Sequence, residues 1–237
     1  IGQGVDLCVE PSCPDDSTFA DAQNVLTKYH LWNKVPESVA NYIKNGTPEQ
    51  ETPKDLSDRN IFNYLVVDVN RAVEGAYERA KELGFNTMIL STFVEGESRE
   101  IGSMHAAIAK EISEYNRPLA KPACFITGGE ATMKINIPDP GYGGPSQQFA
   151  LGAAVWLRDA SGIVIAGTDT DGTDGPTDLA GGMVDCTTPQ RADELGVNIF
   201  EYMDAFNDGV ALKKLGDVIY TGATGTNVND LRIALVV

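Results

Sequence analysis

The fold class is decided by residues 87–112, which read TMILSTFVEGESREIGSMHAAIAKEI. Thr87–Ser91 is a short apolar run of the kind that forms a buried strand. After Ser98 the apolar residues recur every three or four positions, which is the spacing of one helix face. These positions are Ile101, Met104, His105, Ile108 and Ile112. The stretch therefore predicts a strand followed by a long helix, with His105 packed in the core rather than acting in catalysis.

The same alternation extends toward the N-terminus. Ile61–Val67 is a candidate strand, and Asn70 caps a predicted helix that Gly84 ends. Strand, helix, strand and helix in this order imply parallel strands joined by crossover helices. Two earlier helices are also expected, one beginning at Asp16 or Ser17 and one running from Pro36 to Gly46.

The second half of the chain also alternates strands with helices. Its composition shifts near residues 116–122, so we place a domain boundary there and expect domains at 1–118 and 119–237. Gly128, Gly129 and Glu130 are expected to turn between two strands. The expected elements are strands at Pro122–Thr127, Ala131–Ile137, Ile163–Ala166, Val218–Thr221 and Leu231–Val237, and a helix at Gln147–Leu157. The predicted fold class is α/β, with mainly parallel or mixed sheets flanked by helices.

Composition excludes several classes of protein. The 237 residues include 18 basic and 34 acidic side chains, a net charge of −16, so nucleic acid and anionic membrane surfaces are poor partners. No apolar stretch reaches the length of a membrane span, and no signal peptide opens the chain. The four cysteines lack CxxC spacing, which favours reduced thiols in a cytoplasmic protein over a zinc site. Because the chain begins with Ile1, we expect it to be part of a longer protein.

Glycine gives the first indication of a ligand site. Residues 128–182 hold 12 of the 24 glycines, gathered in loops that follow strands, where α/β folds bind ligands. Such glycines can turn backbone N–H groups toward an anion, or can simply form tight turns. No glycine is followed by lysine, which excludes a P-loop, and Gly141–Ser146 does not match the dinucleotide fingerprint GxGxxG.

Two polar loops give the second indication. Residues 167–178 read GTDTDGTDGPTD, and their spacing does not match an EF-hand. Their carboxylates can coordinate Mg²⁺, abstract a proton or cap their own turns, and spacing alone leaves these alternatives open. Residues 221–230, TGATGTNVND, are rich in donors for a phosphate or carboxylate. Lys134 and Arg158 are the only cationic residues between positions 128 and 186, so Arg71 and Arg99 are the natural further candidates to neutralise an anion.

Together these motifs resemble the type-2 glycerate kinase family, whose C-terminal half is the MOFRL domain. The resemblance covers nearly the whole chain and is most specific in DGTDGPTD at 171–178 followed by TGATGTNVNDL at 221–231. Other matching stretches are Asp15–Leu31, Asn63, Asn70-Arg71, Ile89–Thr92, Glu95–Glu97, Arg99–Gly102 and Gly128–Thr132. The resemblance implies that residues 1–118 are part of a Rossmann-like N-terminal domain and that 119–237 are the MOFRL domain, with the active site in the cleft between two α/β domains.

The family implies ATP-dependent phosphorylation of D-glycerate at the 2-hydroxyl. ATP and Mg²⁺ are the expected cofactors, a homodimer is possible, and the N-terminal half would be supplied in cis or by another chain. Two alternatives are a hydroxypyruvate reductase, a name also given to family members, and a non-catalytic binding remnant. The family commonly has arginine after the Gly-Gly that here precedes Pro145, and Val9–Ser12 replaces the usual SGPT.

The clustering of motifs predicts roles for individual residues. Asp174 is the expected hydroxyl-activating or metal-linked acid, and Arg71 is expected to neutralise phosphate or carboxylate. Asp171 and Asp178 are the predicted metal ligands. Substrate or nucleotide contacts are expected from Asn70, Ser91, Glu97, Gly128, Gly129, Glu130, Gln147, Thr226 and Asn227.

Overall fold

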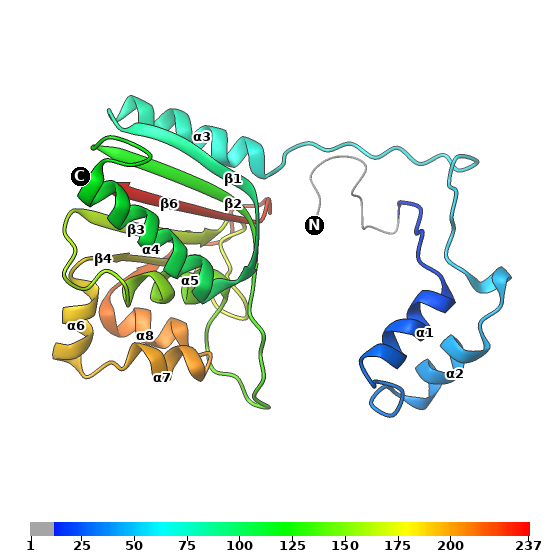
Figure 1. Cartoon of the computed structure of the whole chain (residues 1–237). Coiled ribbons are helices and arrows are strands. Elements are labelled where there is room, and N and C mark those ends of the chain that lie inside the picture. Colours follow the sequence, from blue (N-terminus) through cyan, green and yellow to red (C-terminus); the bar gives the residue numbers. More distant parts are fainter. Residues whose placement is uncertain (1–11) are drawn as a thin grey trace. The chain divides into compact units, whose positions relative to one another are not determined.

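The computed structural model describes residues 12–237 (Figure 1). The chain divides into two compact units, residues 1–66 and residues 67–237, and each is described separately. The predicted domain boundary between residues 118 and 119 does not coincide with the division between these units, and it stays a prediction. In this structure, strands from both sides of that boundary pair in one sheet.

The first unit contains two short helices, α1 (Phe19–Lys28) and α2 (Glu37–Asn45), followed by the 3-10 helix η2 (Pro48–Gln50). Thr18 and Asp21 form a capping box that starts α1, one residue later than the predicted cap. The rings of Phe19 and Tyr42 meet edge to face with centroids 5.3 Å apart, so α1 packs on α2.

The second unit is built on a six-stranded sheet with the order β1-β2-β6-β3-β4-β5. The strands are β1 (Asn86–Glu97), β2 (Ala123–Thr132), β3 (Ile163–Asp169), β4 (Gly181–Asp185), β5 (Val218–Ile219) and β6 (Asp230–Val236). β1 and β2 are parallel and are joined by a crossover helix, as the sequence predicts, whereas the other four pairs are antiparallel. β6 accounts for two of these antiparallel pairs, because it runs between β2 and β3 in the opposite direction, and β4 accounts for the other two, because it runs opposite to both β3 and β5. The sheet is therefore mixed, which confirms the α/β class.

Helices cover both faces of the sheet (Figure 1). They are α3 (Val69–Glu82), α4 (Ser98–Tyr115), α5 (Pro145–Ala154), α6 (Thr188–Leu195), α7 (Ile199–Asp204) and α8 (Asp208–Leu215). α3 packs Val69 and Val73 against Cys124 and Ile126 on one face. The helices from α4 onward bury the larger core on the other face. The predicted helix at 147–157 begins at Pro145, because proline suits the first turn.

His105 lies in this larger core, as predicted. The ring is fully buried, and its Nδ1 lies 2.8 Å from the Ile101 carbonyl oxygen. Its Nε2 lies 2.9 Å from Thr127 Oγ1. Burial lowers the pKa of His105 to about 4, so the ring is neutral at physiological pH and serves packing.

One predicted strand and one predicted turn are wrong, and the strand predicted at Ala131–Ile137 does not form separately, because residues 131–132 belong to β2 and residues 133–137 lie in no strand. Residues 61–67 form no strand, because no neighbouring segment in the described part of the chain supplies ladder hydrogen bonds; Phe62, Tyr64 and Val66 are exposed. Residues 128–130 do not turn, because β2 continues through them. Gly129 has φ +133° and its Cα faces the backbone of Val94 so closely that no Cβ fits, so this glycine permits close strand approach.

The described cysteines differ in their bonding state. Cys124 and Cys186 are free thiols, whereas Cys13 is disulfide-bonded, which corrects the expectation that all cysteines are reduced. Cys8 lies outside the described residues, as do Val9–Pro11 of the segment that replaces SGPT. Among residues 12–237, no helix combines the length and apolar character needed to cross a bilayer.

Candidate active site at the loop edge of the sheet

β1, β2 and β3 end, and β6 begins, along the same border of the sheet, perpendicular to the strands. Glu97 at the end of β1 pairs with Thr132 at the end of β2, and Asp169 at the end of β3 pairs with Asp230 at the start of β6. We call this the loop edge. The two polar loops predicted from the sequence leave from it, and we name them the Asp loop (residues 170–180) and the Thr loop (residues 220–229).

The Asp loop and the Thr loop lie in direct contact. The N–H of Thr224 donates to the Asp171 carbonyl at 3.0 Å, and Asn227 Nδ2 donates to Asp171 Oδ2 at 3.1 Å. Thr170 Oγ1 donates to the Asn229 carbonyl at 2.7 Å. Gly172 has φ +95°, and a Cβ there would collide with the Gly222 carbonyl. The sequence therefore brings both loops together, and glycine is required at their closest approach.

Asp174, the predicted catalytic acid, is buried and holds the start of α5. Its Oδ1 accepts the N–H of Ser146 at 3.1 Å, and its Oδ2 accepts the N–H of Gln147 at 2.8 Å. Only 1% of the residue is exposed. Burial raises the pKa of Asp174 to about 7, while the N–H donors oppose that shift. Both oxygens are thus occupied by a helix N-terminus, a geometry that positions α5 rather than contacting a substrate.

Gln147, a predicted binding residue, belongs to the same buried framework. Its Nε2 donates to Asp174 Oδ2 at 2.8 Å and to Thr177 Oγ1 at 2.9 Å. The side chain is completely buried. Gln147 therefore connects α5 to the Asp loop and does not reach the solvent side of the site.

Acidic side chains from three strands gather at the loop edge. Glu130 was predicted as a site residue, but Asp169 and Asp230 were missed. Burial raises the pKa of Asp169 to about 6, with Asp230, Asp171 and Glu130 adding repulsion. Burial also raises the pKa values of Glu130 and Asp230. Carboxyl groups with raised pKa values at the ends of strands are candidates for proton transfer.

We call Glu130, Asp169 and Asp230 the acidic edge. Arg232 is the buried positive charge beside these residues. Its guanidinium is fully buried, contacts Asp230 through Nη2 and lies over the Phe149 ring. Asp230 also accepts the N–H of Ala131 at 2.9 Å. Burial alone would favour a protonated Asp230, whereas Arg232 favours the charged form. The sequence signal for both residues was their alternation with apolar residues in β6, which put them on the core face.

The residues predicted to bind a metal do not fit that role in this structure. Asp171 Oδ1 accepts from the Thr173 N–H and hydroxyl, and its Oδ2 accepts from Asn227. Asp178 contacts the Tyr142 hydroxyl and forms an ion pair with Lys213 at 3.4 Å. A cation already neutralises Asp178, and within residues 12–237 no three potential ligand side chains cluster around a common point.

Other predicted residues lie on the strands and helices around the edge. Asn70 and Arg71 lie in the first turn of α3, which is capped by Asp68 and not by Asn70 as predicted. Asn70 donates to Asp68 at 2.9 Å, and Arg71 pairs with Glu74 at 3.1 Å. Ser91 lies in an irregular part of β1, and its Oγ accepts the N–H of Phe93. Gly128 packs against Val69 and Val73 of α3, so it brings α3 close to β2. Thr226 and Asn227 are exposed on the Thr loop.

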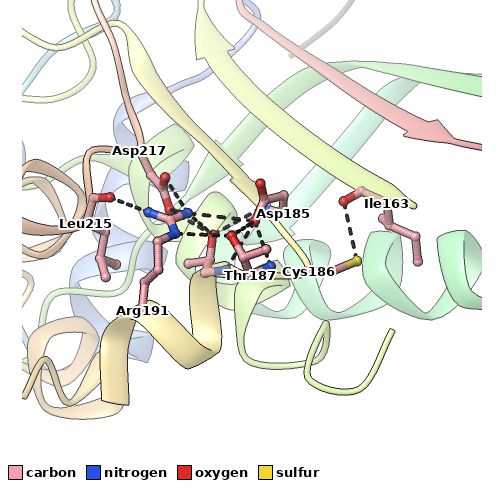
Figure 2. A network of polar contacts seen from close by, with 8 residues as sticks. Ile163, Asp185, Cys186, Thr187, Arg191, Leu215 and Asp217 are labelled. Carbon is pink, nitrogen blue, oxygen red and sulfur yellow. Dashed lines mark hydrogen bonds and ion pairs between the residues drawn. The ribbon is translucent and has the colours of Figure 1, made fainter. Parts of the chain in front are cut away.

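A separate ionic network stabilises the opposite edge of the sheet. Figure 2 shows Arg191 of α6 reaching Asp217 and Asp185, with Nη2 to Asp217 Oδ1 at 2.8 Å. Thr188 Oγ1 donates to Asp217 Oδ2 at 2.8 Å. Asp185 ends β4, whose other end, Gly181, follows the Asp loop. The network therefore fixes α6 and α8 to the end of β4 that lies away from the loop edge.

Comparison with known proteins finds related sequences and structures. Residues 123–230 match the model described as the MOFRL family. The matched segment carries β2, the Asp loop and the Thr loop, and it ends at Asp230. Asn70, Arg71, Ser91 and Glu97 lie before it in the sequence.

The similarity extends beyond the MOFRL domain. The chain is 40% identical to "Glycerate 2-kinase" of Pyrococcus horikoshii, with 95% of this chain and 51% of that protein aligned. A crystal structure of glycerate kinase from Thermotoga maritima matches with a TM-score of 0.75 and 43% identity, covering 94% of this chain and 51% of that one. A "Putative hydroxypyruvate reductase" of Agrobacterium vitis is 35% identical over 95% of this chain and 50% of its own length. These matches confirm the family resemblance, and the chain spans about half the length of these relatives.

Proposed function

We propose that this chain supplies one half of an ATP-dependent D-glycerate 2-kinase. The observation that carries the proposal is the direct contact between the Asp loop and the Thr loop at the loop edge. These loops contain the motifs that are most specific to the family resemblance, and the chain is 40% identical over 95% of its length to a glycerate 2-kinase.

The proposed chemistry is an in-line phosphoryl transfer. A glycerate oxygen forms a bond to the γ-phosphorus of ATP, the bond from that phosphorus to the β,γ-bridging oxygen breaks, and ADP leaves. The hydroxyl proton passes to a carboxylate of the acidic edge. Asp169 suits this role, because its pKa of about 6 leaves it ionised at neutral pH yet basic enough to accept a proton.

The remaining predicted residues divide into two roles under this proposal. Asp174 and Gln147 would position α5, since both are buried in the framework described above. Contact roles remain proposed for Arg71, Asn70, Glu130, Thr226 and Asn227. Asp171 and Asp178 already have hydrogen-bond and ion-pair partners, so no step is assigned to Mg²⁺. A cytoplasmic location, a homodimer and a partner half in cis or on another chain are further proposals that rest on the resemblance.

A hybrid enzyme tests this function directly. In it, the chain replaces the corresponding half of the Thermotoga maritima glycerate kinase, and the unmodified kinase is the control. D-glycerate, ATP and Mg²⁺ should yield ADP and 2-phosphoglycerate, which ³¹P NMR distinguishes from the 3-phosphate.

Two other readouts separate the alternatives. Oxidation of NADH or NADPH by hydroxypyruvate, without ADP formation, would show that the protein is a hydroxypyruvate reductase and not a kinase. Calorimetric binding of Mg-ATP by a well-folded hybrid that makes no phosphoglycerate would instead support a binding remnant.

A further inference from the structure

A small polar pocket lies beside the acidic edge and is assigned to no function above. Its volume is about 150 Å³, and we call it the α4–α5 pocket. Its polar lining consists of Glu97, Arg99, Lys134, Asn136, Gln148 and Asp204. Two cationic groups, two carboxylates and two amides thus surround a space of the size of a small metabolite, in a chain whose net charge is −16.

The cationic part of the pocket comes from separate elements. Arg99 lies in the first turn of α4, an 18-residue helix, and Lys134 follows the end of β2. The helix N-terminus adds a partial positive charge there, and Glu97 makes no side-chain capping bond to it. Instead, Glu97 Oε2 accepts the backbone N–H of Lys134 at 3.2 Å, which joins the two sides of the pocket. Two fixed cationic groups and a helix N-terminus are suited to a carboxylate or phosphate.

The contacts within the pocket are exchangeable. Arg99 Nη1 lies 3.0 Å from Asp204 Oδ1, and these side chains are 45% and 67% exposed. An ion pair this exposed is weak, so an incoming carboxylate can take the place of Asp204. Gln148 is 2% exposed, and its Nε2 makes a long 3.4 Å hydrogen bond to the Met203 carbonyl, while its side chain also contacts the buried Asp208 carboxyl. The floor of the pocket therefore has a buried amide whose 3.4 Å bond a ligand oxygen can replace.

Helix α5 connects the pocket to the acidic edge. Ser146 Oγ donates to Asp230 Oδ1 at 3.4 Å, and Gln148, two residues later on the same helix, lines the pocket. Asp174 fixes the start of this helix, so both positions are held by one rigid element. The capped helix therefore holds Gln148 in a fixed position at the pocket.

We propose that the α4–α5 pocket binds the carboxylate end of a small hydroxy acid of the glycerate class. Arg99 and Lys134 pair with the carboxylate, and Gln148 and Asn136 bind its hydroxyl or carbonyl oxygens. The proposal rests on the function proposed above and gives it a substrate subsite. It also places two cations beside Gln148 of α5, the helix in which Pro145 stands instead of the family arginine.

NMR titration of the ¹⁵N-labelled chain tests the subsite. D-glycerate should shift the side-chain amide signal of Gln148 in a saturable way, inorganic phosphate should compete with it, and glycerol should have no effect because it lacks the carboxylate. Arg99→Gln and Lys134→Gln should each weaken glycerate binding at least about tenfold, as expected for losing a charge-assisted contact. Arg158→Gln is the matched control, since Arg158 is likewise exposed and paired with an aspartate, at 2.6 Å from Asp193.

The outcomes separate the subsite from the kinase activity. Undiminished binding in both folded variants, or equal loss in Arg158→Gln, overturns the subsite even if the hybrid enzyme phosphorylates glycerate. Loss of binding in Arg99→Gln and Lys134→Gln alone supports the subsite even if the hybrid makes no phosphoglycerate. Failure of the unmodified chain to bind glycerate at millimolar concentrations also overturns it. Circular dichroism of each variant confirms that binding was measured on folded protein.

Discussion

Asp174 and Gln147 are joined twice, because Asp174 Oδ2 accepts both the backbone N–H and the side-chain Nε2 of Gln147 at 2.8 Å. A carboxylate from the Asp loop thereby caps a helix through Ser146, a residue 28 positions earlier in the chain. This arrangement makes the loop and α5 one structural unit.

Substitution of Asp174 should therefore destabilise the protein as well as affect activity. Asp174→Ala leaves several buried N–H donors without an acceptor, and we expect a loss of at least about 2 kcal/mol in the free energy of unfolding. Asp174→Asn retains one acceptor and should lose less. Urea unfolding of the chain measures both values. If both variants unfold like the unmodified protein while the hybrid loses turnover, Asp174 acts on the substrate after all.

Gly172→Ala should separate the Asp loop from the Thr loop. The new Cβ would overlap the Gly222 carbonyl at a residue with φ +95°, so both collision and backbone strain are expected, at a combined cost of at least about 2 kcal/mol. Gly225→Ala is the matched control, since Gly225 has φ +83° but nothing within 4 Å of an added Cβ. Its cost should be only about 1 kcal/mol. Equal unfolding midpoints for the two variants would contradict the close contact of the loops.

Asp178 should behave as the partner of Lys213 rather than as a metal ligand. Asp178→Asn and Lys213→Gln should each have only a small effect on the free energy of unfolding, and the double variant should cost less than their sum, because the pair is exposed. The Mg²⁺ concentration that gives half-maximal activity of the hybrid should stay unchanged in Asp178→Asn. A large increase in that concentration would show that Asp178 binds the metal.

Because of Asp208, the free energy of unfolding should decrease as the pH rises from 3.8 to about 8. The Asp208 carboxyl is fully buried, and burial raises its pKa from 3.8 to about 8, although hydrogen bonds from its own backbone N–H and from the Gln148 side chain oppose this shift. The folded form therefore binds a proton that the unfolded form releases between pH 4 and 8, so the stabilisation present below pH 4 is lost as the pH rises through 8.

Asp208→Asn removes this ionisation and should reduce the slope of stability against pH between pH 4 and 8. Asp169 and Asp174, whose pKa values are also raised, to about 6 and about 7, should supply the slope that remains. Thermal unfolding at a series of pH values measures the slope. A slope that is the same in Asp208→Asn and in the unmodified chain would show that Asp208 does not titrate in this range.

The sequence predicts the local elements well where a single periodic pattern determines them. The 3.6-residue spacing from Ile101 to Ile112 predicts α4, and the apolar run at 87–91 predicts the middle of β1. Pairing between distant strands is not encoded in such local patterns. The position of β6 between β2 and β3 was therefore missed, and with it the largely antiparallel sheet.

The candidate site was predicted in part for the same reason. Gly, Asp and Thr in residues 167–178 and 221–230 indicate loops that present polar groups, and those loops do meet. Asp169 and Asp230 become neighbours only through the register of β3 and β6, 61 positions apart in the chain, so no local motif reveals them. Likewise, the cap formed by Asp174 depends on a tertiary contact, whereas the sequence shows only an acid in a loop.

The central place of β6 has a consequence for biosynthesis. This strand hydrogen-bonds to β2 on one side and β3 on the other, yet it is the last of the six to be translated. Until Asp230–Val236 has been synthesised, β2 and β3 each have one edge without a hydrogen-bonded neighbour. These edges and the apolar side chains beside them can then associate with other unfolded chains. The sheet can therefore be completed only after β6 has been synthesised, and chaperones that shield open strand edges should associate with the unit until this strand has been inserted.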